Sequence, residues 1–85
     1  MQLHIIYTEA DMFLSKHPYA SWRSIQDAYP DYKTSLGPWD QDEVIAFLAD
    51  DYPKISPSSE EQVLALLSSA EETKLVTFGG ADNAF

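Results

Sequence analysis

The sequence predicts an α+β domain in which four short helices pack on a small two-stranded sheet made by the two ends of the chain. Residues 2–7 alternate with the period of a strand, and two later segments repeat apolar side chains with the period of a helix. A chain of 85 residues has room for one core. An all-α fold is the alternative. We expect a single acidic globular domain over residues 1–80 and a frayed tail at 81–85.

The N-terminal segment alternates around Leu3, Ile5 and Tyr7, which is typical of a β-strand. Thr8 then resembles a helix N-cap, because two carboxylates follow in what would be the first turn of a helix. We therefore expect a short helix that ends near Lys16, since a proline follows two residues later.

A second short helix is expected after Ser21, which can act as its N-cap. Trp22, Ile25 and Tyr29 fall on one face of such a helix, and a proline ends it. Residues 31–38 are rich in turn-forming residues, so we expect an irregular connection between the two halves of the chain.

Two further helices are predicted from capping patterns. Asp40 and Glu43 have the spacing of a capping box, and the apolar stripe after them ends before the proline at position 53. Either Ser56 before a proline, or Ser58 with Glu61 three residues on, starts the fourth helix.

The third and fourth helices, over residues 41–51 and 57–72, are joined by a connection of about five residues, which favours an antiparallel hairpin. Residues 74–78 then resemble a short strand that two glycines end. This strand would most simply pair with the N-terminal strand, because no other strand is expected.

The chain is strongly acidic, with a net charge of -9 and only five lysine and arginine side chains. Binding to nucleic acid gains much of its free energy when basic side chains replace counterions, so direct contact with DNA, RNA or an anionic membrane is disfavoured. A protein partner with a basic surface is favoured instead. The chain has no cysteine, and its start lacks the pattern of a signal peptide or a membrane span, so we expect a cytoplasmic protein.

No residue pattern typical of catalysis is found in the sequence. His4 and His17 are the only imidazoles, and we interpret them as surface or core residues rather than as a general base. Asp40, Asp42 and Asp51 have the spacing of a calcium loop, but its sixth position lacks the required glycine. The third helix also lacks the basic side chains of a DNA-recognition helix. We expect no enzymatic activity, cofactor or metal.

Acidic residues are concentrated in residues 34–85, which contain ten of the 14 Asp and Glu side chains. Acidic side chains in the first turn of a helix interact favourably with the helix dipole, whereas those in the last turn oppose it. Acidic side chains in last turns therefore need another explanation, either solubility or a basic partner. Acids of the third helix share an arc of about 100° with Phe47. We predict a partner-binding acidic face of Asp40, Glu43, Asp50, Asp51, Glu60, Glu61, Glu71 and Glu72, and partner-binding aromatic side chains Trp39 and Phe47.

Two functions are compatible with these features. The first is a protein–protein interaction module whose contact surface is aromatic and apolar. The alternative is an inhibitor of phage or mobile-element type that mimics nucleic acid and blocks the basic groove of a host DNA- or RNA-handling protein. A complex driven by carboxylates weakens steeply as salt rises, whereas an aromatic contact changes little.

Overall fold

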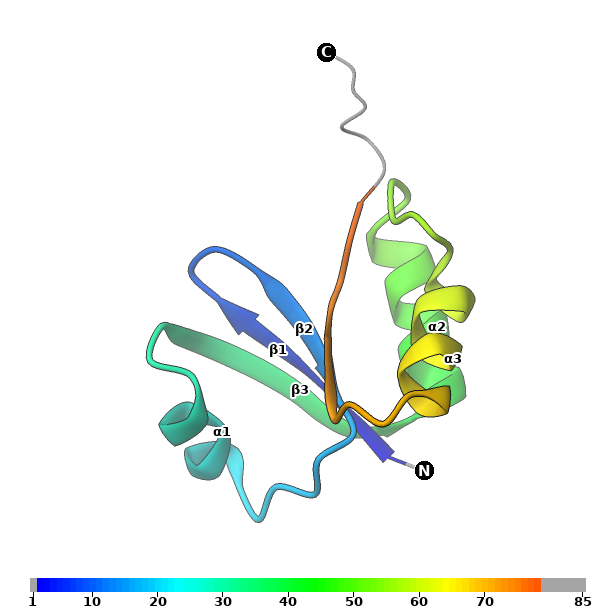
Figure 1. Cartoon of the computed structure of the whole chain (residues 1–85). Helices are drawn as coiled ribbons and strands as arrows, with labels where there is room; N and C mark the ends of the chain where they lie inside the picture. Colours follow the sequence, from blue (N-terminus) through cyan, green and yellow to red (C-terminus); the bar gives the residue numbers. More distant parts are fainter. Residues whose placement is uncertain (1, 79–85) are drawn as a thin grey trace.

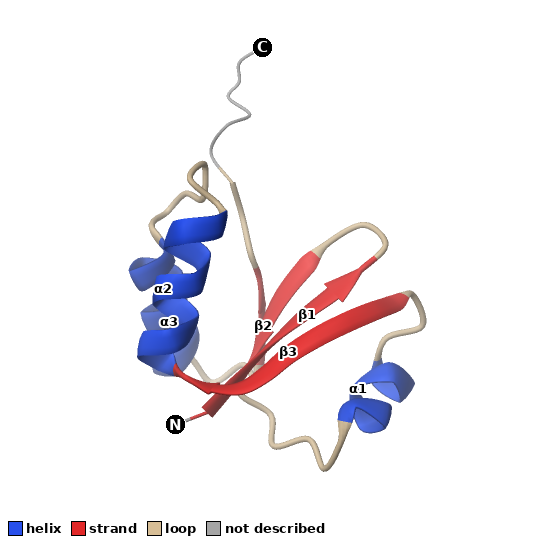
Figure 2. Cartoon of the chain, turned by 180° about the vertical axis from the view of Figure 1, so that it is seen from behind, coloured by secondary structure: helices blue, strands red, loops and turns tan. Residues whose placement is uncertain are grey.

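The structure, a computed structural model, describes residues 2–78. Its elements are β1 (Gln2–Thr8), β2 (Met12–Ser15), α1 (Trp22–Ala28), β3 (Tyr32–Asp40), α2 (Gln41–Asp51), α3 (Ser59–Ser68) and β4 (Thr73–Leu75). The strands form one antiparallel sheet in the order β3-β1-β2-β4. Helices α2 and α3 cover one face of this sheet, and α1 lies on the other side, beside β3 (Figure 1; Figure 2).

The fold is α+β, but the expectation of four helices on a two-stranded sheet is wrong, because the structure has three helices and four strands. The helix expected between Thr8 and Lys16 is replaced by a tight loop and β2. Thr8 Oγ1 accepts a hydrogen bond from the Asp11 backbone N–H at 3.0 Å, which is the bond that a helix N-cap makes. Here the same bond closes a β-hairpin, because Thr8 N–H also pairs with the Asp11 carbonyl at 2.9 Å.

The irregular connection expected at residues 31–38 is also wrong, because residues 32–38 lie within β3. Leu3 pairs with Trp39 and Ile5 with Leu36, so β3 carries one extra residue opposite β1. This bulge accommodates Gly37, whose φ of 113° is unfavourable for other residues. Gly37, which made this segment resemble a turn in the sequence, is therefore favoured by the bulge of the strand.

The C-terminal strand exists, but its partner was predicted wrongly. Strand β4 pairs with β2, because both edges of β1 are already occupied by β2 and β3. Beyond β4, a single bridge joins Ile55 and Phe78. The glycines expected to end this strand and the tail at 81–85 lie outside the described residues.

The three helices lie close to their predicted positions. Glu43 Oε1 accepts from the Asp40 N–H at 3.0 Å, and Ser58 Oγ accepts from the Glu61 N–H at 3.2 Å, so both predicted capping pairs are confirmed. Helices α2 and α3 run antiparallel, side by side (Figure 1). Within residues 2–78, every helix is too short or too polar to cross a membrane.

Helix α3 ends at Ser68, four residues earlier than expected. Its last turn has no basic side chain of its own. Lys16, which follows β2, supplies one: its Nζ donates to the Leu66 carbonyl at 2.8 Å and to the Ser69 carbonyl at 2.7 Å. The ammonium group thus adds a charged donor to two carbonyls at the end of α3 and faces the negative end of the helix dipole.

The main core lies between the sheet and the α2–α3 hairpin. Because side chains alternate along a strand, β1 also buries Ile6 on the opposite face, where α1 buries Ile25. Both faces of β1 are therefore covered. The buried residues of the main core are Leu3, Ile5, Met12, Leu14, Val44, Leu48, Val63, Leu66 and Val76.

Candidate interaction site

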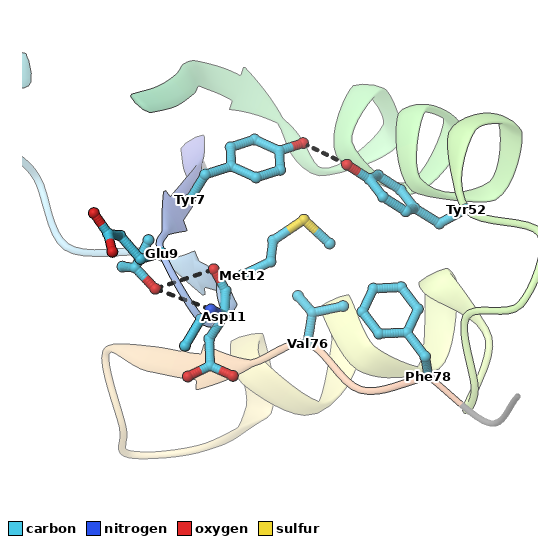
Figure 3. A pocket seen from close by; sticks show the side chains of 9 residues that line it. Tyr7, Glu9, Asp11, Met12, Tyr52, Val76 and Phe78 are labelled. Carbon is cyan, nitrogen blue, oxygen red and sulfur yellow. Dashed lines mark hydrogen bonds between the residues drawn. The ribbon is translucent and has the colours of Figure 1, made fainter. Parts of the chain in front are cut away.

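A pocket of about 380 Å³ lies where the loop between β1 and β2 meets the end of α2 and the segment after β4 (Figure 3). Side chains of three kinds line it. Tyr7, Tyr52 and Phe78 supply aromatic rings, and the buried Met12 and Val76 lie between them. Glu9 and Asp11 line the end of the pocket at the hairpin loop, with their carboxylates directed outward (Figure 3). We call this the acid-rimmed pocket.

Two tyrosines join the sheet to α2 at this pocket. The hydroxyl oxygens of Tyr7 and Tyr52 are 2.9 Å apart and share a hydrogen bond (Figure 3). Burial, the bond to Tyr52 and the nearby negative charge of Asp51 raise the pKa of the Tyr7 hydroxyl well above its ordinary range. The Tyr7 hydroxyl is therefore uncharged at neutral pH.

The charge of the pocket comes from its rim. Glu9 and Asp11 are exposed, and their loop is fixed by backbone hydrogen bonds, including one from the Glu9 N–H to the Asp31 carbonyl at 3.1 Å. No basic side chain of the described chain lines the pocket. In residues 2–78 the ion pair found joins His17 to Glu72, so both rim carboxylates remain free to meet an external cation.

Four aromatic rings form a continuous row that leads to the pocket. Trp39 and Phe47 are 5.4 Å apart between ring centroids, Phe47 and Tyr52 are 6.1 Å apart, and Tyr52 and Phe78 are 5.7 Å apart. These are distances of favourable edge-to-face and tilted contacts. The two predicted partner-binding aromatics, Trp39 and Phe47, thus lie half-buried at one end of this aromatic row, and the pocket lies at the other.

The structure divides the predicted acidic face between two ends of the helical hairpin. Because α2 and α3 are antiparallel, the C-terminal turn of α2 and the first turn of α3 lie together, on the side of the acid-rimmed pocket (Figure 1). Asp40 and Glu43, at the start of α2, lie at the other end, where Glu43 is engaged in its capping box. The acids on the pocket side are Asp50, Asp51, Glu60 and Glu61.

The expected position of Glu71 and Glu72 in the last turn of a helix is wrong, because α3 ends before them. They lie on the connection to β4, so the helix dipole does not act on them as predicted. Glu72 Oε1 contacts His17 Nδ1 at 2.8 Å, which gives this acid a structural partner. The hairpin loop brings Glu9 and Asp11 to the pocket instead. They were not among the predicted binding residues, because their segment was expected to be helical.

The fold and this pocket define a small antiparallel α+β domain with an acidic and aromatic surface. Comparison with protein-family models, curated proteins and solved structures finds no match for this chain. Among the residues that the structure describes, no group of three or more histidine, aspartate or glutamate side chains could hold a metal ion. The functional interpretation therefore rests on the geometry of the chain itself.

Proposed function

We propose that this protein is a protein–protein interaction module that receives a basic side chain of its partner in the acid-rimmed pocket. The observation that carries this proposal is that Glu9 and Asp11 line the same pocket as the rings of Tyr7, Tyr52 and Phe78. A lysine or arginine has an apolar stem and a charged end, so it fits a pocket with apolar walls and an acidic rim. The carboxylates would pair with the cation while the rings contact the stem.

The size of the pocket supports recognition of one side chain rather than of a large ligand. A volume of about 380 Å³ is at the lower end of the range for ligand pockets, about 300–1,000 Å³. Phe78 is 42 % exposed and belongs to both the pocket and the aromatic row. The row therefore extends the contact surface with aromatic groups, which contribute strongly to binding at protein interfaces.

A nucleic-acid-mimicking inhibitor is a second candidate, supported by the gathering of acids on one side of the molecule. Asp50, Asp51, Glu60 and Glu61 lie on the same side as the two rim carboxylates. A basic groove would contact all of these acids, whereas a single inserted side chain would depend mainly on the rim. Neutralising the two rim carboxylates and, separately, the four acids of the helix ends therefore distinguishes the two candidate functions.

The test measures binding of short peptides that carry lysine or arginine flanked by apolar residues, with acidic peptides of the same length as a reference. We expect the Glu9→Gln/Asp11→Asn variant to lose about tenfold in affinity for basic peptides. The matched control, Asp27→Asn/Asp42→Asn, removes the same charge from exposed positions outside the pocket and should change affinity little. Equal losses in both variants would show that net charge, rather than the pocket, attracts the peptide.

A further inference from the structure

Gln62, on α3, is a polar residue in a buried position, with 1 % of its surface exposed. Its Nε2 donates to the carbonyls of Pro57 and Thr77, each at 2.9 Å, and its Oε1 accepts from the Thr77 N–H at 3.1 Å. A buried amide without partners costs free energy, and here both ends of the amide are bonded. Gln62 does not line the acid-rimmed pocket, so it can affect that pocket only through the segment that it binds.

The amide of Gln62 pairs with Thr77 in the way that a neighbouring strand would. Strand β4 is at the edge of the sheet, and the segment after it still pairs inward, because the Val76 N–H donates to the Met12 carbonyl at 2.8 Å. Successive residues of an extended segment direct their backbone groups to opposite sides, so the N–H and the carbonyl of Thr77 point away from β2. A side-chain amide has a donor and an acceptor, as a backbone peptide group has, and Gln62 binds both groups of Thr77.

The segment that Gln62 binds forms one wall of the acid-rimmed pocket. Thr77 lies between Val76 and Phe78, and both of these side chains line the pocket (Figure 3). Because side chains alternate along an extended segment, fixing the backbone of Thr77 directs its two neighbours to the same side. Phe78 is 42 % exposed and its ring lies 5.7 Å from that of Tyr52, so the ring is held by its backbone as well as by packing.

Contacts from the loop before α3 support the same segment. Thr77 Oγ1 donates to the Ser56 carbonyl at 2.8 Å, and the Ser56 N–H donates to the Thr77 carbonyl at 3.3 Å. Gln62 also binds this loop, through the Pro57 carbonyl. One buried amide therefore connects the pocket wall both to the loop and to α3, and α3 is itself fixed by packing in the main core.

We propose that Gln62 is a positioning residue of the acid-rimmed pocket, which holds Phe78 in place and thereby sets the affinity for the basic side chain of the partner. This inference rests on the proposed function. Gln62 does not touch the partner, because it acts through the backbone of Thr77. A wall that is in place before binding does not have to be ordered when the partner arrives, so the affinity depends on this anchor.

The experiment uses Gln62→Met, which keeps the length of the side chain and removes its three hydrogen bonds. Nuclear Overhauser effects between the rings of Phe78 and Tyr52 report the position of Phe78 with no peptide present. Titration calorimetry with the basic peptides described above measures the affinity. We expect the ring contacts to weaken and the peptides to bind several-fold more weakly, because Phe78 must then be ordered on binding.

Lys16→Met is the matched control, because it removes a donor from the other end of α3 and changes a residue outside the acid-rimmed pocket. It should keep the ring contacts and the peptide affinity of the parent protein. The proposal is wrong if Gln62→Met binds the peptides as the parent protein does, or if both variants lose affinity equally.

Hydrogen exchange in the parent protein tests the anchor without a substitution. A saturating basic peptide should slow exchange of the Thr77 N–H more than that of the Lys16 N–H, which is bonded to the Glu72 carbonyl at the opposite end of β4. Equal slowing of the two amides would overturn the proposal, because binding would then stabilise only the fold as a whole. Absence of peptide binding by the parent protein would instead refute the proposed function, and is told apart from a failed anchor because the ring contacts are measured without peptide.

Discussion

Gly37 shows how a single residue permits the β3 bulge. A Cβ atom built at this position would lie 2.6 Å from the Leu3 carbonyl oxygen, and the backbone φ is 113°. Both the contact and the dihedral angle are unfavourable for any residue with a side chain. We expect Gly37→Ala to lower the free energy of unfolding by about 1–3 kcal/mol, as measured by urea denaturation. Thr34→Ala, at an exposed position three residues away on the same strand, is the control, and an equal effect of both would contradict this explanation.

His4 predicts a pH dependence of stability. Burial, and to a smaller extent the neighbouring His17, lowers the pKa of His4 below its ordinary value of 6.5. The unfolded chain therefore binds a proton more readily than the folded chain. The stability contributed by neutral His4 is complete above pH 6.5 and declines as the pH falls from 6.5 toward the lowered pKa of the folded state.

We expect His4→Phe to abolish this decline, because the ring keeps its volume but no longer titrates. Chemical denaturation between about pH 7 and pH 5 measures it, since the carboxylates titrate mainly at lower pH. His17→Gln should retain most of the dependence. A pH profile of His4→Phe that matches the parent protein would rule out His4 as its source.

At the scale of single elements, Lys16 connects β2 to the end of α3. Lys16→Met keeps the apolar stem but removes the charged donor from the Leu66 and Ser69 carbonyls. The Leu66 carbonyl keeps its bond from the Ser69 N–H. We expect a loss of about 1–2 kcal/mol in the free energy of unfolding. Thermal unfolding of Lys16→Met and of Lys33→Met, whose side chain is exposed on β3, measures the difference. Similar melting temperatures for the two variants would show that the cap contributes nothing.

The helices could be predicted from the sequence because their signals are local. Asp40 with Glu43, and Ser58 with Glu61, form the expected capping pairs within four residues of each other. Strand β2 could not be predicted in this way, because the bond from the Asp11 N–H to Thr8 Oγ1 occurs in helix caps and in hairpin loops alike. Only the pairing of β2 with its neighbouring strands decides whether this segment forms a helix or a hairpin.

The candidate site was predicted in part. Trp39 and Phe47 were predicted to bind a partner, and the structure places them half-buried in a row with Tyr52. The acid-rimmed pocket itself brings together Tyr7, Tyr52 and Phe78, which are far apart in the sequence. No sequence pattern specifies such a pocket, because it is created by strand pairing and by the return of the chain after α3.

At the scale of the whole molecule, opposite ends of the sheet differ in the kind of side chain that they carry. The hairpin end carries the rim carboxylates Glu9 and Asp11, and the other end carries Lys16 and two imidazoles. A chain with a net charge of -9 therefore does not present a uniform negative surface. In the interaction that we propose, a basic partner approaches the hairpin end.

The acids that end α2 predict a gain of stability on charge reversal. Asp50 and Asp51 lie in a last turn without a basic residue, so they oppose the helix dipole and add to the overall repulsion. We expect Asp50→Lys/Asp51→Lys to raise the free energy of unfolding by about 0.5–2 kcal/mol at low salt, and by less at high salt. Glu43→Lys, which removes a capping acid from the first turn, should be destabilising. If both variants shift the urea midpoint in the same direction, the dipole explanation fails.

The bulge in β3 also has a consequence for how these molecules behave at high concentration. Strand β3 forms one edge of the sheet and is nine residues long, and an edge of this length can recruit a strand of another molecule. The extra residue twists this edge, and Pro38 within it has no N–H to donate. The bulge and Pro38, which made this segment resemble a loop in the sequence, therefore interrupt the row of backbone groups on which intermolecular sheet growth would depend.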